Sequence, residues 1–436
     1  MVFGSQGPKG LAFTHPFFTS LKNIRVRQPA NNTWLGKMAL SISSFPLELS
    51  LVAALCLATL TLWISAYWPV AFLEISVFLI AGLALVLGRV PGSGTHFPLY
   101  ALCFIVLWGC FQLITSSTVD RFATERATLQ WMTWAAVYYV GVSTIHEENR
   151  ATLIRALIVW FGFAVAVEAI LQAYLSPGKA FGLFPTGYHS FVMGPIVYHT
   201  HFAAFIEVIL PIALFLALRE ARTSYTFLCI SAVLLTAVVV SASRGGLLIG
   251  LTEVGAVLFL SHLKKGKVGG RIGFLAMALA SLTSILTLVV GFETVSERFY
   301  SGAMTLGRLQ FAISTLHMIA FHPWVGWGLG CWPAVYPAFA TFDPGAIVNQ
   351  AHSDWLQWTA EGGLPVGLAM LFLAVWSLRP AIRSIWGIGV LAVLVHAAFD
   401  YPFSRPAVGA WPILILSMAA ASNQSGVVGS TTLRSG

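Results

Sequence analysis

Apolar stretches of about 18 or more residues recur along nearly the whole chain, and each is long enough to cross the hydrocarbon core of a bilayer. Hydrophobic residues make up 57% of the 436 residues and charged residues only 9%. A soluble domain carries roughly 25% charged residues. The alternating segments of about ten residues that typify a transmembrane barrel do not occur in the sequence. The pattern therefore predicts an all-α polytopic membrane protein.

We predict twelve transmembrane spans, with boundaries good to a few residues. They cover residues 46–66, 68–88, 98–116, 127–145, 152–175, 201–219, 224–242, 245–262, 272–291, 353–378, 383–400 and 406–421. The chain then divides into an N-terminal tail (1–45), spans one to nine (46–291), a long external loop with short helices (292–351), spans ten to twelve (352–421) and a C-terminal tail (422–436).

The net charge of +8 follows the topology and does not indicate nucleic-acid binding. With both termini in the cytoplasm, 17 of the 24 basic residues lie inside and 7 outside, as the positive-inside rule requires. The first 45 residues lack the apolar core and cleavage site of a signal peptide, so we expect a loosely ordered cytoplasmic tail. The five cysteines show neither a disulfide framework nor metal-ligand spacing.

Arg244 lies between the seventh and eighth spans, in the run Ser-Ala-Ser-Arg-Gly-Gly of residues 241–246. A guanidinium at the membrane boundary is costly unless an anion compensates it. Gly245 and Gly246 follow directly, and we expect them to let a ligand approach the backbone and to leave helix-start N–H groups free. This combination suits a phosphate or pyrophosphate. The alternative is an arginine that snorkels to lipid headgroups.

The long external loop carries a helical stretch near residues 302–320 that contains Arg308. Its apolar positions recur at helical spacing, so the helix could hold this cation over the membrane rim. Arg298 is a second candidate for the same task, and a solvated surface arginine is the alternative. The run His322-Pro-Trp-Val-Gly-Trp-Gly-Leu-Gly330 follows.

His352 stands at the start of the tenth span and has an ordinary pKa of about 6.5, which makes it a natural proton acceptor near neutral pH. A helix cap or a packed polar group is the alternative. Glu361 follows about two and a half turns into the span, ahead of Gly362 and Gly363, which permit close helix contact. A carboxylate at that depth must be paired, protonated or in contact with water.

Further acids lie inside the predicted spans. Glu74, Glu168 and Glu207 lie nearer the outer end of their spans, as Glu361 does, and Glu253 lies near the middle. Asp400 lies at the outer end of the eleventh span, where it could orient a histidine or arginine or only cap a turn. The clustering indicates either a polar cavity open to the outside or structural hydrogen bonds between helices, and the sequence assigns these acids no role.

Common catalytic and metal-binding signatures do not occur in the sequence. It contains no His-Glu-x-x-His, no Gly-x-Ser-x-Gly, no P-loop and no Asp-x-Asp pair. We therefore expect no metal and no cofactor, with arginines neutralising a pyrophosphate leaving group.

These motifs resemble those of the O-antigen ligase and O-antigen polymerase superfamily. The match rests on Ser243-Arg-Gly-Gly246, on Arg308 ahead of the 322–330 run, on His352 with Leu356 and Glu361-Gly362, and on His201-Phe-Ala-Ala-Phe205. Together they cover about residues 180–405. Ser353 and Asp354 follow His352 where many ligases carry an asparagine, and this departure leaves the acceptor open.

The resemblance implies an inverting, metal-independent glycosyltransferase of the GT-C type. Such a protein takes a glycan from undecaprenyl pyrophosphate at the periplasmic face of the bacterial inner membrane. Carried over, Arg244 and Arg308 bind the pyrophosphate and stabilise its developing charge, and His352 accepts the proton of the acceptor hydroxyl. The substrate-binding residues predicted beside them are His201, Gly245, Gly246, Arg298 and Glu361.

The preferred reaction is transfer of O-antigen to the lipid A core. One alternative keeps the chemistry and changes the acceptor, as in an O-antigen or exopolysaccharide polymerase or a protein O-oligosaccharyltransferase. A second alternative is a transporter of the lipid-linked glycan. The sequence shows no internal repeat and places Arg244 at the rim, not at the midplane, which favours the enzyme. It does not identify the glycan, the acceptor or the oligomeric state.

Overall fold

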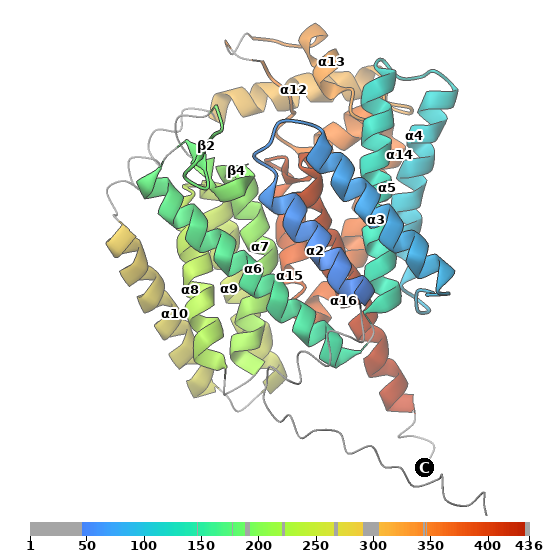
Figure 1. Cartoon of the computed structure of the whole chain (residues 1–436). Coiled ribbons are helices and arrows are strands. Elements are labelled where there is room, and N and C mark those ends of the chain that lie inside the picture. The colour runs from blue at the N-terminus through green and yellow to red at the C-terminus, as the bar shows by residue number, and fades with distance from the viewer. Residues whose placement is uncertain are drawn as a thin grey trace, which may run out of the picture. The chain divides into compact units, whose positions relative to one another are not determined.

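The computed structural model describes residues 46–145, 147–176, 178–187, 192–219, 223–265, 269–290, 305–342, 345 and 347–431. The helices are α2 (Pro46–Leu60), α3 (Trp68–Val86), α4 (His96–Ile114), α5 (Arg121–Thr144), α6 (Glu148–Leu175), α7 (His199–Arg219), α8 (Ser224–Val240), α9 (Arg244–Lys265), α10 (Gly269–Val290), α12 (Thr305–Phe321), α13 (Trp332–Val335), α14 (Asp354–Ser384), α15 (Ile388–His396) and α16 (Pro406–Thr431). Figure 1 shows how they are arranged.

Short elements fill some of the connections. Two pairs of two-residue strands lie between α6 and α7, β1 (Lys179–Ala180) with β2 (Phe184–Pro185) and β3 (Val192–Met193) with β4 (Val197–Tyr198), and both pairs are antiparallel. Three short 3-10 helices are η1 (Gly194–Ile196), η2 (Tyr336–Ala338) and η3 (Pro402–Ser404). The predicted tails and Arg298 lie wholly or largely outside the described residues.

Each of the twelve predicted spans overlaps a helix, and the protein is a helical multi-pass membrane protein. Among the described residues, seven helices are long and apolar enough to cross a membrane: α3, α4, α6, α7, α9, α10 and α14. The shorter helices α2, α8 and the start of α16 are also apolar. The count of twelve crossings therefore stays a prediction.

The eleventh predicted span, 383–400, is wrong as a continuous helix. Its helix α15 has nine residues, which at 1.5 Å per residue is about 13 Å, less than half of a hydrocarbon core of about 30 Å. The chain leaves the helix after His396, whose Nδ1 lies 2.8 Å from the Glu207 carboxylate. The run Asp400-Tyr401-Pro402 then turns toward α16. Hydropathy alone could not detect this, because the turn residues 397–399 are apolar.

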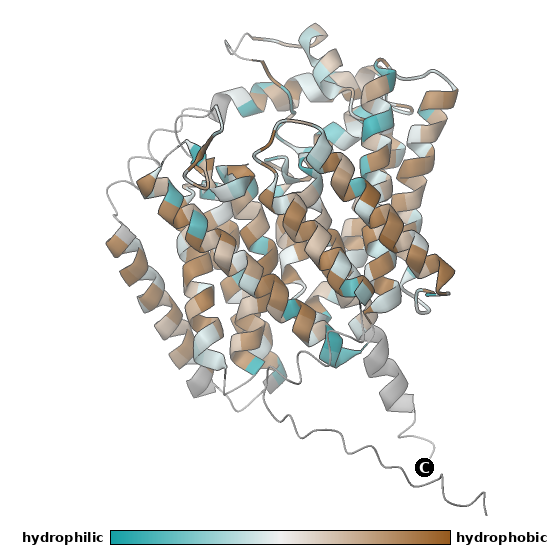
Figure 2. Ribbon diagram, in the orientation of Figure 1, coloured by the Kyte–Doolittle hydropathy of each residue, from teal (hydrophilic) through white to brown (hydrophobic). Residues whose placement is uncertain are grey.

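Helix α7 is the most deeply buried of the seven, with 94% of its most apolar window inside the protein. It packs against α6, α8, α9 and α15. The outer helices instead present large apolar side chains outward, including Leu79 at 69% exposure and Leu288 at 67%. Figure 2 shows the apolar colour along α3, α6 and α10. Such a surface is suited to lipid contact, since exposed apolar area of this extent is rare on soluble proteins.

Helix α12 lies across one end of the upright helices (Figure 1). Its buried face packs Phe311 and Met318 into a small apolar cluster with Trp332 and Tyr336. The apolar residues predicted at helical spacing in residues 302–320 therefore form the face of α12 that packs against the protein. The same packing fixes the position of Arg308, one turn before Phe311.

A break in α14 anchors the loop that follows α12. Gly363 has φ 71° and ψ −178°, a conformation that is essentially confined to glycine. In a regular helix residue 364 would donate to the carbonyl of residue 360. Here Leu364 N donates to the Pro323 carbonyl at 2.7 Å, and Pro365 has no N–H to donate.

Backbone N–H groups of the 322–330 loop donate to carbonyls of α14 near its break at Gly363. The Ala360 carbonyl accepts from Trp327 N at 3.1 Å, and the Glu361 carbonyl accepts from Gly328 N at 3.0 Å. Because buried backbone groups need partners, loop and helix hold each other in one arrangement. This interlock joins two sequence motifs, the 322–330 run and Glu361-Gly362-Gly363.

We expect Gly363→Ala to destabilise the protein by about 2–5 kcal/mol, because it adds backbone strain to steric overlap. A Cβ at this position would lie 2.4 Å from the Trp324 carbonyl oxygen. Thermal unfolding in detergent measures the effect. Gly255→Ala in α9 is the control, since a Cβ there meets nothing within 4 Å. Equal melting temperatures for the two variants would contradict the interlock.

Candidate active site

Asp400 lies between two of the residues singled out from the sequence. Its side chain is 1% exposed. Oδ2 lies 3.6 Å from Nη2 of Arg308 and Oδ1 lies 3.9 Å from Nδ1 of His352. Both distances are longer than a hydrogen bond. The Asp400–Arg308 distance is short enough for charge attraction, and Asp400 would attract the His352 ring in the same way once that ring is protonated. The structure thus brings Arg308 and His352 to opposite oxygens of one carboxylate.

The His352 ring is held by aromatic contacts. It stacks on Phe311 with a centroid distance of 5.4 Å, and the Tyr401 ring meets it edge-on at 4.8 Å. Burial lowers the pKa of His352 to about 4, with Arg308 acting in the same direction and Asp400 opposing. The imidazole is therefore neutral at physiological pH and can accept a proton.

Arg308 projects from α12 and is about one-third exposed. Besides the Asp400 contact, its Nη1 donates to the Phe399 carbonyl at 3.3 Å. The guanidinium is thus fixed on one side by segment 399–400 and open on another. A fixed, partly exposed guanidinium suits an anionic ligand.

Arg244 begins α9, and its side chain is exposed. Ser243 caps the helix, because its Oγ accepts from Gly246 N at 3.1 Å. Gly245, the residue after Arg244, packs tightly on the Phe399 ring, and a Cβ there would lie 2.4 Å from that ring. Because the Phe399 carbonyl also accepts from Arg308, the first turns of α9 and α12 meet at the same turn of the chain.

The N–H of Gly246 is not free as expected, and the approach of a ligand to the backbone at Gly245 and Gly246 stays a prediction. The N–H is used by the Ser243 cap, and a Cβ at Gly246 would lie 2.5 Å from the Ala203 side chain. At Gly245 the close approach is likewise to protein, the Phe399 ring. The glycines are needed for helix packing at the site.

His201 lies in the first turn of α7 and is 1% exposed. Its ring meets Tyr401 at 4.7 Å and Tyr198 at 4.8 Å. Tyr401 thus contacts both His201 and His352 edge-on. The structure therefore places His201 in the same cluster as His352 but in the interior of the protein. The Tyr401 ring contacts both histidine rings.

Glu361 has partners of its own in the interlock. Oε2 accepts from Gly330 N at 2.9 Å, and Oε1 accepts from Trp332 N at 3.3 Å and Gln357 Nε2 at 3.0 Å. Its side chain is buried. This predicted substrate-binding residue therefore anchors the loop that carries α13.

Backbone strain gathers at this end of the bundle. Six non-glycine residues in the described part of the chain have positive φ. Three of them lie in or beside the cluster: Val197, Ala242 and His352, with φ of 67°, 55° and 54°. Each such conformation costs on the order of 1–3 kcal/mol and persists only where the surroundings hold it, typically at functional sites.

Several residues of the cluster escaped the sequence analysis. Phe311 follows Arg308 by three positions on the same helical face, and Tyr401 follows Asp400 directly, so each carried a local signal. Tyr198 carried none, because its contact with Tyr401, at 5.8 Å between ring centroids, joins distant parts of the chain. His396 stacks on Phe399 with a centroid distance of 5.2 Å.

The described residues contain no group of three or more His, Cys, Asp or Glu side chains that could hold a metal ion. Within these residues, the charged side chains beside His352 are Arg308 and Asp400. The arrangement can hold an anion at the guanidinium and accept a proton at the imidazole.

Residues 208–371 match a family model described as O-antigen ligase. The matched segment runs from α7 into α14 and contains Arg244, Arg308 and His352, whereas His201 and Asp400 lie outside it. No curated protein matches the chain.

Proposed function

Through residues 208–371 this chain belongs to the O-antigen ligase superfamily, and on that premise we propose that it transfers a glycan from undecaprenyl pyrophosphate to a hydroxyl of the lipid A core. The reaction takes place at the periplasmic face of the inner membrane, with both termini in the cytoplasm. The observation that carries the proposal is the position of the Asp400 carboxylate between Arg308 and His352.

The proposed chemistry is a single displacement. The acceptor oxygen attacks the anomeric carbon of the glycan while its proton passes to the neutral imidazole of His352. The bond between the anomeric carbon and the pyrophosphate oxygen breaks, and the electron pair stays on the pyrophosphate. Attack from the face opposite the leaving group inverts the anomeric configuration.

Asp400 has two tasks in this scheme. It holds Arg308 near the leaving group, and it stabilises the imidazolium that His352 becomes until the proton passes to water. Arg244 supplies a second cation from the start of α9. Cations placed where negative charge develops stabilise the transition state in place of a metal, and such electrostatic contributions are often the largest in an enzyme.

The proposed function predicts a specific product from purified protein in liposomes supplied with a lipid-linked glycan. Lipid A core and a second lipid-linked repeat are offered in parallel, with and without EDTA. We expect glycosylated lipid A core and free undecaprenyl pyrophosphate, with EDTA changing the rate little. Mass spectrometry identifies both products.

The same assay distinguishes the alternatives. Elongation of the lipid-linked repeat in place of lipid A core would identify a polymerase. An intact lipid-linked glycan that crosses the bilayer would identify a transporter and contradict the enzymatic proposal. Activity lost in EDTA and restored by a divalent ion would contradict the metal-independent mechanism.

A further inference from the structure

A second cluster of cations lies at the far ends of the helices that build the candidate active site. Helices α7, α9 and α14 each begin at that site and end at a pocket of about 350 Å³. At 1.5 Å per residue, 21 or more residues separate the two by about 30 Å. The pocket is therefore distinct from the active site and lies at the opposite side of a bilayer.

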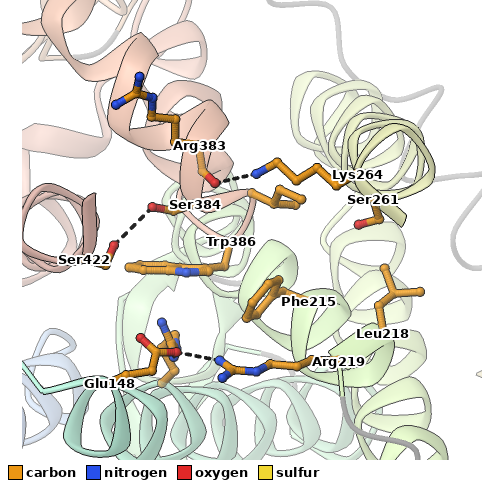
Figure 3. A pocket seen from close by; sticks show the side chains of 12 residues that line it. Glu148, Phe215, Leu218, Arg219, Ser261, Lys264, Arg383, Ser384, Trp386 and Ser422 are labelled. Carbon is orange, nitrogen blue, oxygen red and sulfur yellow. Dashed lines mark hydrogen bonds and ion pairs between the residues drawn. The ribbon is translucent and has the colours of Figure 1, made fainter. Parts of the chain in front are cut away.

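The lining of this pocket is strongly basic. Its lining contains four basic residues, Arg155, Arg219, Lys264 and Arg383, and one acidic residue, Glu148. Figure 3 shows Glu148 paired with Arg219, and Lys264 reaching the Arg383 carbonyl. Since one carboxylate does not balance four cations, the pocket has an excess of positive charge.

Arg155 forms the buried part of this pocket. Its side chain is 1% exposed. Nη2 donates to Glu148 at 2.7 Å and to Thr152 at 2.8 Å, but Nε has no hydrogen-bond partner among the described residues. A buried guanidinium is costly unless its N–H groups are satisfied. An anionic oxygen in the pocket would satisfy the Nε–H donor.

Aromatic rings form the wall behind the guanidinium. Its carbon lies 4.9 Å from the Trp386 ring centroid and 5.8 Å from that of Phe215, within the range of cation–π attraction. Trp386 is positioned by a strained turn, since Ile385 has φ 61°, an outlying conformation for a β-branched residue. Strain of this kind is typical of binding sites.

We propose that this pocket binds a phosphate-bearing anion, presented by the headgroup of an anionic phospholipid or by a soluble phosphate. Arg155 satisfies the phosphate from within, and the exposed cations Arg219 and Lys264 contact it from the rim. Basic pockets between helices on the cytoplasmic side of membrane proteins commonly bind such headgroups. The pocket uses none of the residues of the proposed glycan-transfer site.

The test measures binding to purified protein in a neutral detergent. Dioleoylphosphatidylglycerol, dioleoylphosphatidylcholine and sodium phosphate are added separately, and bound molecules are counted by native mass spectrometry while melting temperatures are followed. Wild type is compared with Arg219→Gln/Lys264→Gln. The control is Arg89→Gln/Arg379→Gln, which removes the same charge from exposed positions that do not line the pocket.

We expect phosphatidylglycerol to bind wild type and the control alike, and to bind the pocket variant about 10- to 30-fold more weakly, since each cation near a headgroup contributes on the order of a few-fold to tenfold. If sodium phosphate binds with the same dependence on the pocket cations, the natural anion is soluble. Both variants keep Arg244 and Arg308, so the outcome does not depend on the glycan-transfer proposal.

Equal binding by the pocket variant and the control, or no binding of either anion to wild type, would overturn the proposal. Should the double variant not fold, the single variant Lys264→Gln replaces it, because the Lys264 side chain is exposed and lines the pocket. Binding to that variant as tight as to wild type and to Arg379→Gln would have the same consequence.

Discussion

Replacement of His352 by alanine is expected to slow glycan transfer by about 10²- to 10⁴-fold, the usual contribution of a general base. The reason is its position. The ring is neutral, aligned between Phe311 and Tyr401, and beside a carboxylate that stabilises its protonated form. The measurement is kcat and KM for transfer by purified, folded protein.

His317→Ala is the matched control, because His317 is an exposed histidine of α12 that faces away from the buried side of that helix. It should keep wild-type turnover. If His352→Ala also turned over at near wild-type rates, His352 would not be the base.

The pH profile of the wild-type enzyme provides a second measurement on the same residue. Burial lowers the pKa of His352 to about 4. The imidazole therefore stays unprotonated as the pH falls from neutrality, and it becomes protonated and unable to accept a proton only near pH 4. The acid limb of kcat/KM reports this group in the free enzyme. In Arg308→Ala the limb should move to higher pH, because the guanidinium contributes to the lowering. A wild-type limb near the ordinary value of about 6.5 would contradict the buried site.

Replacement of Arg308 or Arg244 by alanine is expected to lower kcat by about 10²- to 10³-fold for each, the effect of removing one donor to a developing anion. Arg308→Ala also leaves the 1% exposed Asp400 without its cation. We therefore expect it to lower the melting temperature more than Arg244→Ala does.

Arg121→Ala is the control for lost positive charge, because Arg121 is exposed and pairs with Glu125 within its own helix. It should retain activity, as exposed pairs contribute little. Wild-type turnover in both arginine variants would refute the proposed pyrophosphate site.

Most of the helices could be predicted from the sequence, because long apolar runs have few alternatives to membrane helices. The short length of α15 could not be predicted, since the residues that follow it, 397–399, are apolar and its last residue, His396, contacts Glu207 of a distant helix. The kink in α14 was signalled by Gly363 and Pro365. That the 322–330 loop fills it follows from hydrogen bonds between segments that pair only after folding.

The candidate site was predictable in part. Arg308 and His352 meet at Asp400, which the sequence analysis noted without a role. The Glu361 carboxylate accepts backbone N–H groups of the loop, which the sequence did not indicate, and its predicted binding of substrate stays a prediction. The expected free N–H at Gly246 is used by Ser243, three residues before it, which caps the helix. Arg155 was counted only as an inside charge, since nothing local indicates a burial of 99%.

The most direct test of the account is a cryo-electron microscopy structure of the protein bound to undecaprenyl pyrophosphate. We predict that the pyrophosphate lies within about 4 Å of the Arg308 guanidinium, the usual limit of an ion pair, with Arg244 on its other side and the His352 ring facing the same space. A pyrophosphate bound elsewhere, with Arg308 and His352 still closed on Asp400 and no ligand beside them, would contradict it.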